Sequence, residues 1–253
     1  MFPLLRMPVA AIICCLLLAG CSTPEEKLTS TEWLRENSSV LRDLESFEKS
    51  RQQQAVVRLK GLGPDRGAAV IVALLREARV GYRGEVLLAR ILADWRDPRG
   101  ISYLLKYLRH QDQGAVEIAA QGLVAFEGNR EVALALLEML KSSTKTERFA
   151  AARVLEEIGS AELLDGFLGF YTGESEKEVR GLLVKVLLQS KHPNRDEFLV
   201  EALMDSDQAI REMAWEGLRK RPGTPKVNYD PAAGAESRTE AVKSLRSWAA
   251  RGR

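Results

Sequence analysis

The sequence predicts an all-α fold, namely an α-solenoid of about six antiparallel helical hairpins closed by a C-terminal capping helix. Leu, Ala, Glu and Arg are abundant and aromatic residues make up only 6% of the chain, which is a composition that favours helices. A short phrase of small and aliphatic residues returns every 31 or 32 residues. A sustained period of this length is typical of helical repeats, in which each unit buries its apolar face against its neighbours.

The first 20 residues have the pattern of an export signal. Arg6 is followed by an uncharged apolar run from Met7 to Gly20. This run is shorter than the roughly 20 residues that a membrane-spanning helix needs. Its length instead fits the apolar region of a secretory signal peptide, so we expect residues 1–20 to be removed.

The run closes with Leu18-Ala19-Gly20-Cys21, which resembles the lipobox of bacterial lipoproteins. The resemblance implies that the Cys21 thiol receives diacylglycerol, that the chain is cleaved before it, and that the new amine is acylated, for example with palmitate. Ser22 at the next position resembles the pattern sorted to the outer membrane. We therefore expect a lipid-anchored protein of the cell envelope, on the periplasmic side of the outer membrane. The alternative is an ordinary signal peptide with a chance cysteine.

Composition limits the partners of the mature chain. Removing residues 1–20 takes away Arg6 alone among the charged residues, which leaves 36 basic and 35 acidic side chains and a net charge of about +1. Nucleic-acid binders usually carry a concentrated basic surface, so we expect no nucleic-acid partner. The other two cysteines, Cys14 and Cys15, would leave with the signal, so we expect no disulfide in the mature domain.

Residues 21–30 are rich in Ser, Thr, Pro and charged side chains, which predicts a flexible tether. Thr29-Ser30-Thr31-Glu32 then offers a capping box, and the apolar spacing that follows predicts a first helix from Thr31 to Lys49. Its apolar stripe contains Trp33, Val40, Leu41, Leu44 and Phe47. We assign residues 31–222 to the repeat solenoid.

The clearest repeat unit is Arg130 to Gly159. One face of its first helix contains Val132, Ala133, Leu136, Leu137 and Leu140. After the polar break at 141–145, a second helix carries Ala151, Ala152, Leu155 and Ile158 and stops at Gly159, a favourable C-terminal residue. This second-helix phrase recurs around Ala89, Ala120, Ala152 and Val184.

The phrase from Glu147 to Gly159 resembles the second helix of HEAT and HEAT-like repeats, and its short period is closest to the variant noted in phycobilin lyases. The resemblance covers about 39–221 and implies stacked hairpins. The landmarks of the rival tetratricopeptide repeat do not recur in phase. In HEAT-like solenoids the second helices line the concave face.

Two sets of polar residues repeat along the predicted second helices. Arg90, Gln121, Arg153 and Lys185 each follow a small core position, and stacking would join them into a partly basic stripe, our candidate partner-binding surface. The alternative is that long polar side chains fill any solvent-facing helix position. Arg148, Arg180 and Arg211 form a second set near the helix starts. The HEAT resemblance implies that such arginines brace neighbouring turns.

The last segment, 223–253, departs from the period. Pro222 and Gly223 end the final repeat helix, and 236–250 predicts one more helix with Ala241, Val242, Leu245 and Trp248 on its apolar stripe. We expect this helix to cap the last hairpin. A capped solenoid is typically a monomer, so we expect a monomer.

The sequence offers no catalytic constellation. Its two histidines, His110 and His192, stand beside expected turns, and the His-Glu pairs of HEAT-repeat di-iron hydroxylases are absent. We therefore expect neither an enzyme nor a bound metal or cofactor. The pattern favours a non-enzymatic scaffold that holds another envelope protein on its concave face. The alternatives are a phycobilin-lyase-like chromophore chaperone or enzyme, and a lipoprotein that binds a small ligand or glycan.

Overall fold

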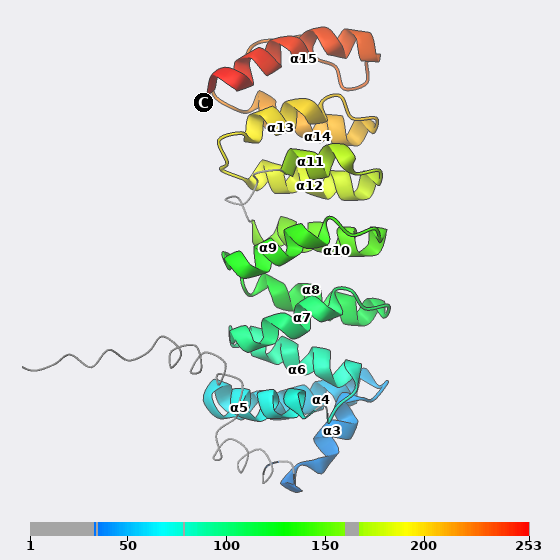
Figure 1. The fold of residues 1–253 in the computed structure, drawn as a ribbon, viewed down its shortest axis with the longest axis vertical. Coiled ribbons are helices and arrows are strands. Elements are labelled where there is room, and N and C mark those ends of the chain that lie inside the picture. The colour runs from blue at the N-terminus through cyan, green and yellow to red at the C-terminus, as the bar shows by residue number, and fades with distance from the viewer. Residues whose placement is uncertain (1–32, 34, 78, 160–166, 253) are drawn as a thin grey trace, which may run out of the picture. The chain divides into compact units, whose positions relative to one another are not determined.

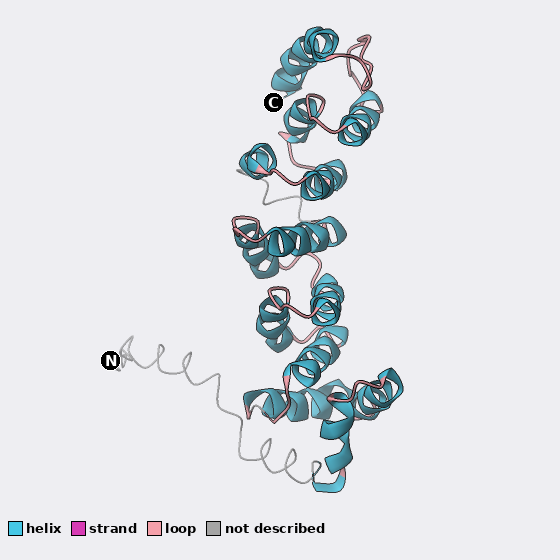
Figure 2. Cartoon of the chain, turned by 90° about the vertical axis from the view of Figure 1, so that its right-hand side faces the viewer, coloured by secondary structure: helices cyan, strands magenta, loops and turns pink. Residues whose placement is uncertain are grey.

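The computed structural model describes residues 33, 35–77, 79–159 and 167–252. These residues hold helices α3 to α15 with short 3-10 turns, and within them there is no strand (Figure 2). The predicted all-α class is confirmed. The chain divides into two compact units, residues 1–95 and 96–253.

The described residues of the first unit contain the four helices α3 to α6. They are α3 (Ser38–Leu44), α4 (Lys49–Lys60), α5 (Gly63–Arg76) and α6 (Tyr82–Asp94). Both α3 and α5 pack against α4 and α6. Eight of the fourteen residues of α5 are buried, so this helix supplies much of the unit's core.

The single first helix predicted from Thr31 to Lys49 is wrong in its extent. A turn at Asn37 precedes α3, and the Asn37 side-chain amide donates to the carbonyl of Trp33 at 3.0 Å. The chain leaves the helix after Leu44, and just beyond this point the Ser46 hydroxyl accepts the amide of Glu48 at 3.1 Å. A Glu45 carboxylate oxygen accepts the amide of Gly84 in α6 at 2.8 Å. Phe47, predicted on the buried stripe, is 84% exposed.

The second unit holds the remaining helices. They are α7 (Ile101–Tyr107), α8 (Gln113–Val124), α9 (Arg130–Met139), α10 (Lys145–Ile158), α11 (Phe167–Gly173), α12 (Lys177–Gln189), α13 (Arg195–Ala202), α14 (Gln208–Arg219) and α15 (Ala235–Ala249). Consecutive helices pack as pairs, α7 with α8, α9 with α10 and α13 with α14. Helices α8, α10, α12 and α14, which we call the second helices, also contact one another in this order: α8 with α10, α10 with α12, and α12 with α14 (Figure 1).

Local signals set the helix ends of this unit. The side chains of Asp112, Asn129 and Asp207 each accept amides of the first turn that follows, which satisfies donors that a helix start leaves free. Helix α10 ends at Gly159, whose φ of 60° lies in the left-handed region. The two helices predicted between Arg130 and Gly159 are α9 and α10, which pack against each other, and their predicted apolar faces are buried except that Leu137 is half-exposed.

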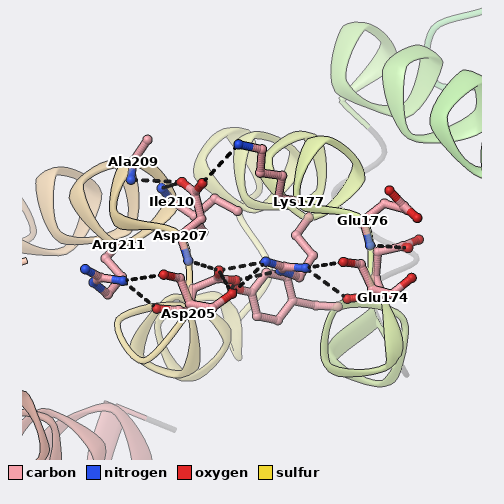
Figure 3. A network of polar contacts seen from close by, with 12 residues as sticks. Glu174, Glu176, Lys177, Asp205, Asp207, Ala209, Ile210 and Arg211 are labelled. Carbon is pink, nitrogen blue, oxygen red and sulfur yellow. Dashed lines mark hydrogen bonds and ion pairs between the residues drawn. The ribbon is translucent and has the colours of Figure 1, made fainter. Parts of the chain in front are cut away.

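A network of arginines joins successive pairs on the side where each pair turns. Arg180 in α12 donates through Nη1 to the carbonyls of Glu174 and Ser175 at the start of its own helix, at 3.2 and 2.9 Å. Its Nε and Nη2 donate to both carboxylate oxygens of Asp205 in the next turn, at 2.8 and 2.9 Å. The Tyr171 hydroxyl donates to the same carboxylate at 2.5 Å. Figure 3 shows Asp205 lying between Glu174 and Arg211.

Arg148 in α10 makes the corresponding bonds one helical pair earlier. Arg148 donates to the Ser142 and Ser143 carbonyls at 3.0 and 3.1 Å and forks onto the Glu174 carboxylate at 2.7 and 2.9 Å. We call Arg148, Arg180 and Arg211 the arginine ladder. Each member braces the turn before its own helix.

The ladder ends on the C-terminal segment. Arg211 donates to the carbonyls of Asp205 and Ser206 and, in place of a carboxylate, to the carbonyl of Pro231 at 2.8 Å. The Tyr229 hydroxyl donates to the carbonyl of Leu203 at 2.6 Å. These bonds tie the segment that leads to α15 onto the last helical pair.

Helix α15 corresponds to the helix predicted at 236–250. Its Ala241, Val242 and Leu245 are buried as predicted, whereas Trp248 is only half-buried. The helix packs against α13, and Arg246 forks onto the Glu201 carboxylate at 2.7 and 2.8 Å.

Among the described residues, no helix is both long and apolar enough to span a membrane. The predicted signal peptide (1–20), the lipid-bearing Cys21 and the tether (21–30) lie outside the described residues.

Candidate functional site

The second helices of residues 96–253 place the predicted stripe residues side by side. Ala120 in α8, Ala152 in α10 and Val184 in α12 are buried against neighbouring helices. Because each residue turns a helix by about 100°, the following residue points out of the core. Gln121 and Lys185 are accordingly exposed, and Arg153 is half-exposed.

Arg90 is described within the first unit, where it has its own partner. Its Nε donates to the carboxylate of Asp94, one turn later in α6, at 2.9 Å. The other carboxylate oxygen of Asp94 pairs with Lys60 at 2.5 Å.

In the second unit, Glu117 links two of the stripe residues. The Arg153 guanidinium forks onto both oxygens of the Glu117 carboxylate at 2.7 Å each, across the α8–α10 boundary. The Gln121 side-chain amide donates to the same carboxylate at 2.9 Å. The hydrogen bonds from Arg153 and then Gln121 lower the pKa of Glu117, so this carboxylate is ionised at neutral pH.

The stripe continues with a second interhelical pair. Lys185 in α12 lies 3.2 Å from the carboxylate of Glu156 in α10. Lys145, at the start of α10, pairs with Glu176 at 2.7 Å and Glu178 at 3.3 Å. The structure therefore brings Gln121, Arg153 and Lys185 together, but as a row of balanced charge rather than the partly basic stripe that was predicted.

The sequence reasoning missed the acids of this row, although a signal for them exists. Glu117 and Arg153 are 36 positions apart, which is one period of 32 plus one helical turn. Glu156 and Lys185 are 29 positions apart, which is one period minus three. Residues offset by three or four positions share a helix face, so the combination of period and turn indicates a pair across stacked helices.

A hollow of about 680 Å³ opens beside this row, between α8 and α10. Its floor includes buried Leu108, Ala120 and Ala150. Its rim carries three cations and three carboxylates, namely Arg109, Lys145, Arg153, Glu117, Glu147 and Glu178. Many of the lining side chains are exposed, so the hollow is open to solvent on one side.

A second hollow of about 330 Å³ lies along α12 and α14. Apolar Leu182, Ile210 and Met213 line it, together with Gly181. Phe149 of α10 lines both hollows and is 38% exposed, so it forms the ridge between them. We call the two hollows and this ridge the Phe149 surface. The stripe prediction did not include Phe149.

The two histidines serve local turns. His110 Nδ1 accepts the amide of Asp112 at 3.1 Å, and His192 Nδ1 accepts the amide of Asn194 at 3.2 Å. Over the part of the chain that the structure describes, no cluster of His, Cys, Asp and Glu could hold a metal ion.

No protein-family model matches the chain, and no curated protein matches it either. The chemistry of the site must therefore be inferred from its own residues.

Proposed function

We propose that this chain is a membrane-anchored, non-enzymatic scaffold that holds another protein of the cell envelope on the face formed by its second helices. In this proposal residues 31–222 form a HEAT-like solenoid, 223–253 caps it, and lipid on Cys21 anchors it to the outer membrane on the periplasmic side. The observation that carries the proposal is the continuous face of α8, α10, α12 and α14, where the row of balanced charge adjoins the Phe149 surface.

The physical character of this face supports a protein partner. Protein interfaces combine an apolar centre with a polar rim, and the Phe149 surface has that arrangement. The helical pairs supply a rigid support for such a face, and stacked repeats characteristically bind through extended surfaces.

Photo-crosslinking in cells tests the scaffold. A photoreactive residue replaces Gln121 or Lys185, both exposed on the face, and in a matched control replaces Glu138, which is exposed on α9. We expect both face positions to capture the same discrete protein and Glu138 to capture none. A smear without a discrete product, or the same product from Glu138, would contradict the proposal.

A separate experiment tests the anchor. The native chain should sediment with membranes, and mass spectrometry of its N-terminal peptide should show acyl chains on Cys21. The Cys21→Ser chain should lose both properties. A Cys21→Ser chain that is cleaved normally and remains in the membrane fraction would remove the lipid from the proposal.

A further inference from the structure

The second hollow of the Phe149 surface contains space beside Gly181 that no side chain of the described residues fills. Gly181 stands in the middle of α12, where glycine costs about 1 kcal/mol of helix stability relative to alanine. A Cβ built on Gly181 would meet no atom within 4 Å outside its own local backbone. Intramolecular packing therefore does not demand glycine here, and its missing side chain enlarges the second hollow.

Apolar side chains stand on the far sides of this room. Phe149 borders it from α10, while Leu182 of α12 and Met213 of α14 line the same hollow. Aromatic residues and methionine are enriched at the centres of protein interfaces, and methionine adapts its shape to a partner. An incoming apolar side chain would meet Phe149, Met213 and the bare backbone at Gly181.

The charges around the two hollows favour a polypeptide partner over a phosphate-rich one. Every cation on their rims lies within 4 Å of a carboxylate: Arg109 with Glu147, Lys145 with Glu178, Arg153 with Glu117, Lys177 with Asp207 and Lys185 with Glu156. Such a rim has no net field to attract a phosphate-rich lipid or nucleic acid. It complements a polypeptide that carries charges of both signs around an apolar centre.

We propose that the Phe149 surface binds a near-neutral segment of the partner protein through two apolar anchors, one in each hollow, with the second anchor seated over Gly181. This inference rests on the proposed scaffold function and specifies the kind of partner. The first hollow lies at α8 and α10 and the second along α12 and α14. Because packed helices lie about 8 to 10 Å apart, the two anchors would be on the order of 10 to 20 Å apart. A helical segment spans that distance in about 7 to 13 residues.

Peptide selection tests the proposal with defined probes. Random 16-residue peptides displayed on phage are selected against the complete lipidated chain in detergent micelles, and the enriched peptides are synthesised for fluorescence anisotropy. We expect peptides of low net charge with two separated apolar residues. Phe149→Ala and Met213→Ala should weaken their binding at least tenfold. Leu134→Ala, which removes a side chain 49% exposed on α9, should change it less than twofold.

A substitution that fills the second hollow separates binding from folding. Gly181→Leu replaces a helix-weakening residue with a good helix former, places its Cβ in open space and directs the rest of the side chain toward the second hollow. We expect its melting temperature to be unchanged or higher while peptide binding falls at least tenfold. Peptides that bind the Gly181→Leu and Phe149→Ala chains as tightly as the native chain would overturn the inference. So would the absence of enriched peptides, or an enriched set without apolar anchors.

Crosslinking in two backgrounds distinguishes failure of this inference from failure of the scaffold function. The photoreactive residue at Lys185 is placed in the native chain and in Phe149→Ala. A partner captured from the native chain but not from Phe149→Ala agrees with the inference. Equal capture from both overturns the inference and leaves the scaffold standing, whereas no discrete capture from either contradicts the scaffold itself.

Discussion

The arginine ladder and the row of balanced charge run along the same second helices, yet they differ in what surrounds their ion pairs. Arg148 and Arg180 fork onto carboxylates whose side chains are only 4% and 3% exposed. Arg153 forks onto Glu117 with similar distances, but that carboxylate is 42% exposed. The sequence spacing of the two sets is almost the same.

The difference shows that burial of the acid, rather than the geometry of the pair, separates a structural arginine from a surface one. A buried carboxylate that loses its partner keeps the cost of having left water, whereas an exposed one regains its hydration. The ladder arginines also satisfy backbone carbonyls at the turns, and Arg153 makes no such bond among those described here. Four experiments test this contrast.

Substitution of Arg180 should have the largest effect. Arg180→Met leaves the buried Asp205 carboxylate without its cation and the Glu174 and Ser175 carbonyls without their donor. We expect a loss of about 3 to 5 kcal/mol in the free energy of unfolding, measured by urea denaturation. A loss below about 1 kcal/mol would mean that the ladder is as dispensable as a surface pair.

Substitution of Arg211 should cost less. Its three acceptors are neutral carbonyls, so Arg211→Met strands no carboxylate. We expect a loss of about 2 kcal/mol by the same measurement. We also expect faster hydrogen exchange in α15, because the bond to Pro231 ties that segment to α14. Unchanged exchange in α15 would show that Arg211 does not hold the cap.

Acid should weaken the ladder more than it weakens the row, because the ladder acids are buried whereas Glu117 is 42% exposed. Burial alone would raise the pKa of Asp205, but the hydrogen bonds from Arg180, Tyr171 and the Asp207 amide outweigh it and lower the pKa below its usual value. Glu174 has a lowered pKa for the same reasons, with Arg148 as the donor. Because the folded pKa values lie below the unfolded ones, their stabilisation is complete above the unfolded values, about 4, and is lost as pH falls through the folded values.

The measurement is the drop in melting temperature between pH 5 and pH 3. We expect Asp205→Asn to show a smaller drop than the native chain, because it has already lost this contribution at pH 5. Glu117→Gln, the matched exposed acid, should reduce the drop much less, because solvent screens its pair with Arg153. Equal drops in all three chains would contradict the assignment of acid sensitivity to the ladder.

Substitution of Arg153 should have the smallest effect. Exposed pairs contribute about 0.2 to 1 kcal/mol, so Arg153→Ala should cost less than about 1 kcal/mol in low salt. The difference from the native chain should vanish in about 1 M salt, where charges are screened within about 3 Å. A loss of about 2 kcal/mol in the free energy of unfolding that persists in high salt would show that Arg153 is a structural arginine like those of the ladder.

The sequence by itself determined those helices of residues 96–253 whose apolar spacing and end signals lie within one short stretch of the chain. Helix α10 was predictable because apolar spacing, a polar break and Gly159 act within one short stretch. Helix α15 was predictable for the same reason, from Pro222 and Gly223 before it and its own apolar stripe. The outward direction of Gln121 and Lys185 followed from their position beside small core residues.

Only the tertiary structure decided which side chains meet. The helix predicted through Phe47 ends at Leu44, and the Glu45 side chain beside that end bonds Gly84, a residue 39 positions away whose place no local pattern encodes. The positive charge of the predicted stripe is balanced, because Glu117 of α8 pairs with Arg153 of α10 and Glu156 of α10 pairs with Lys185 of α12. The room over Gly181 likewise exists only where α10, α12 and α14 come together. Helical periodicity predicts which residues lie on the same face of one helix. Which faces of different helices contact each other depends on how whole helices pack, and that is a property of the assembled fold.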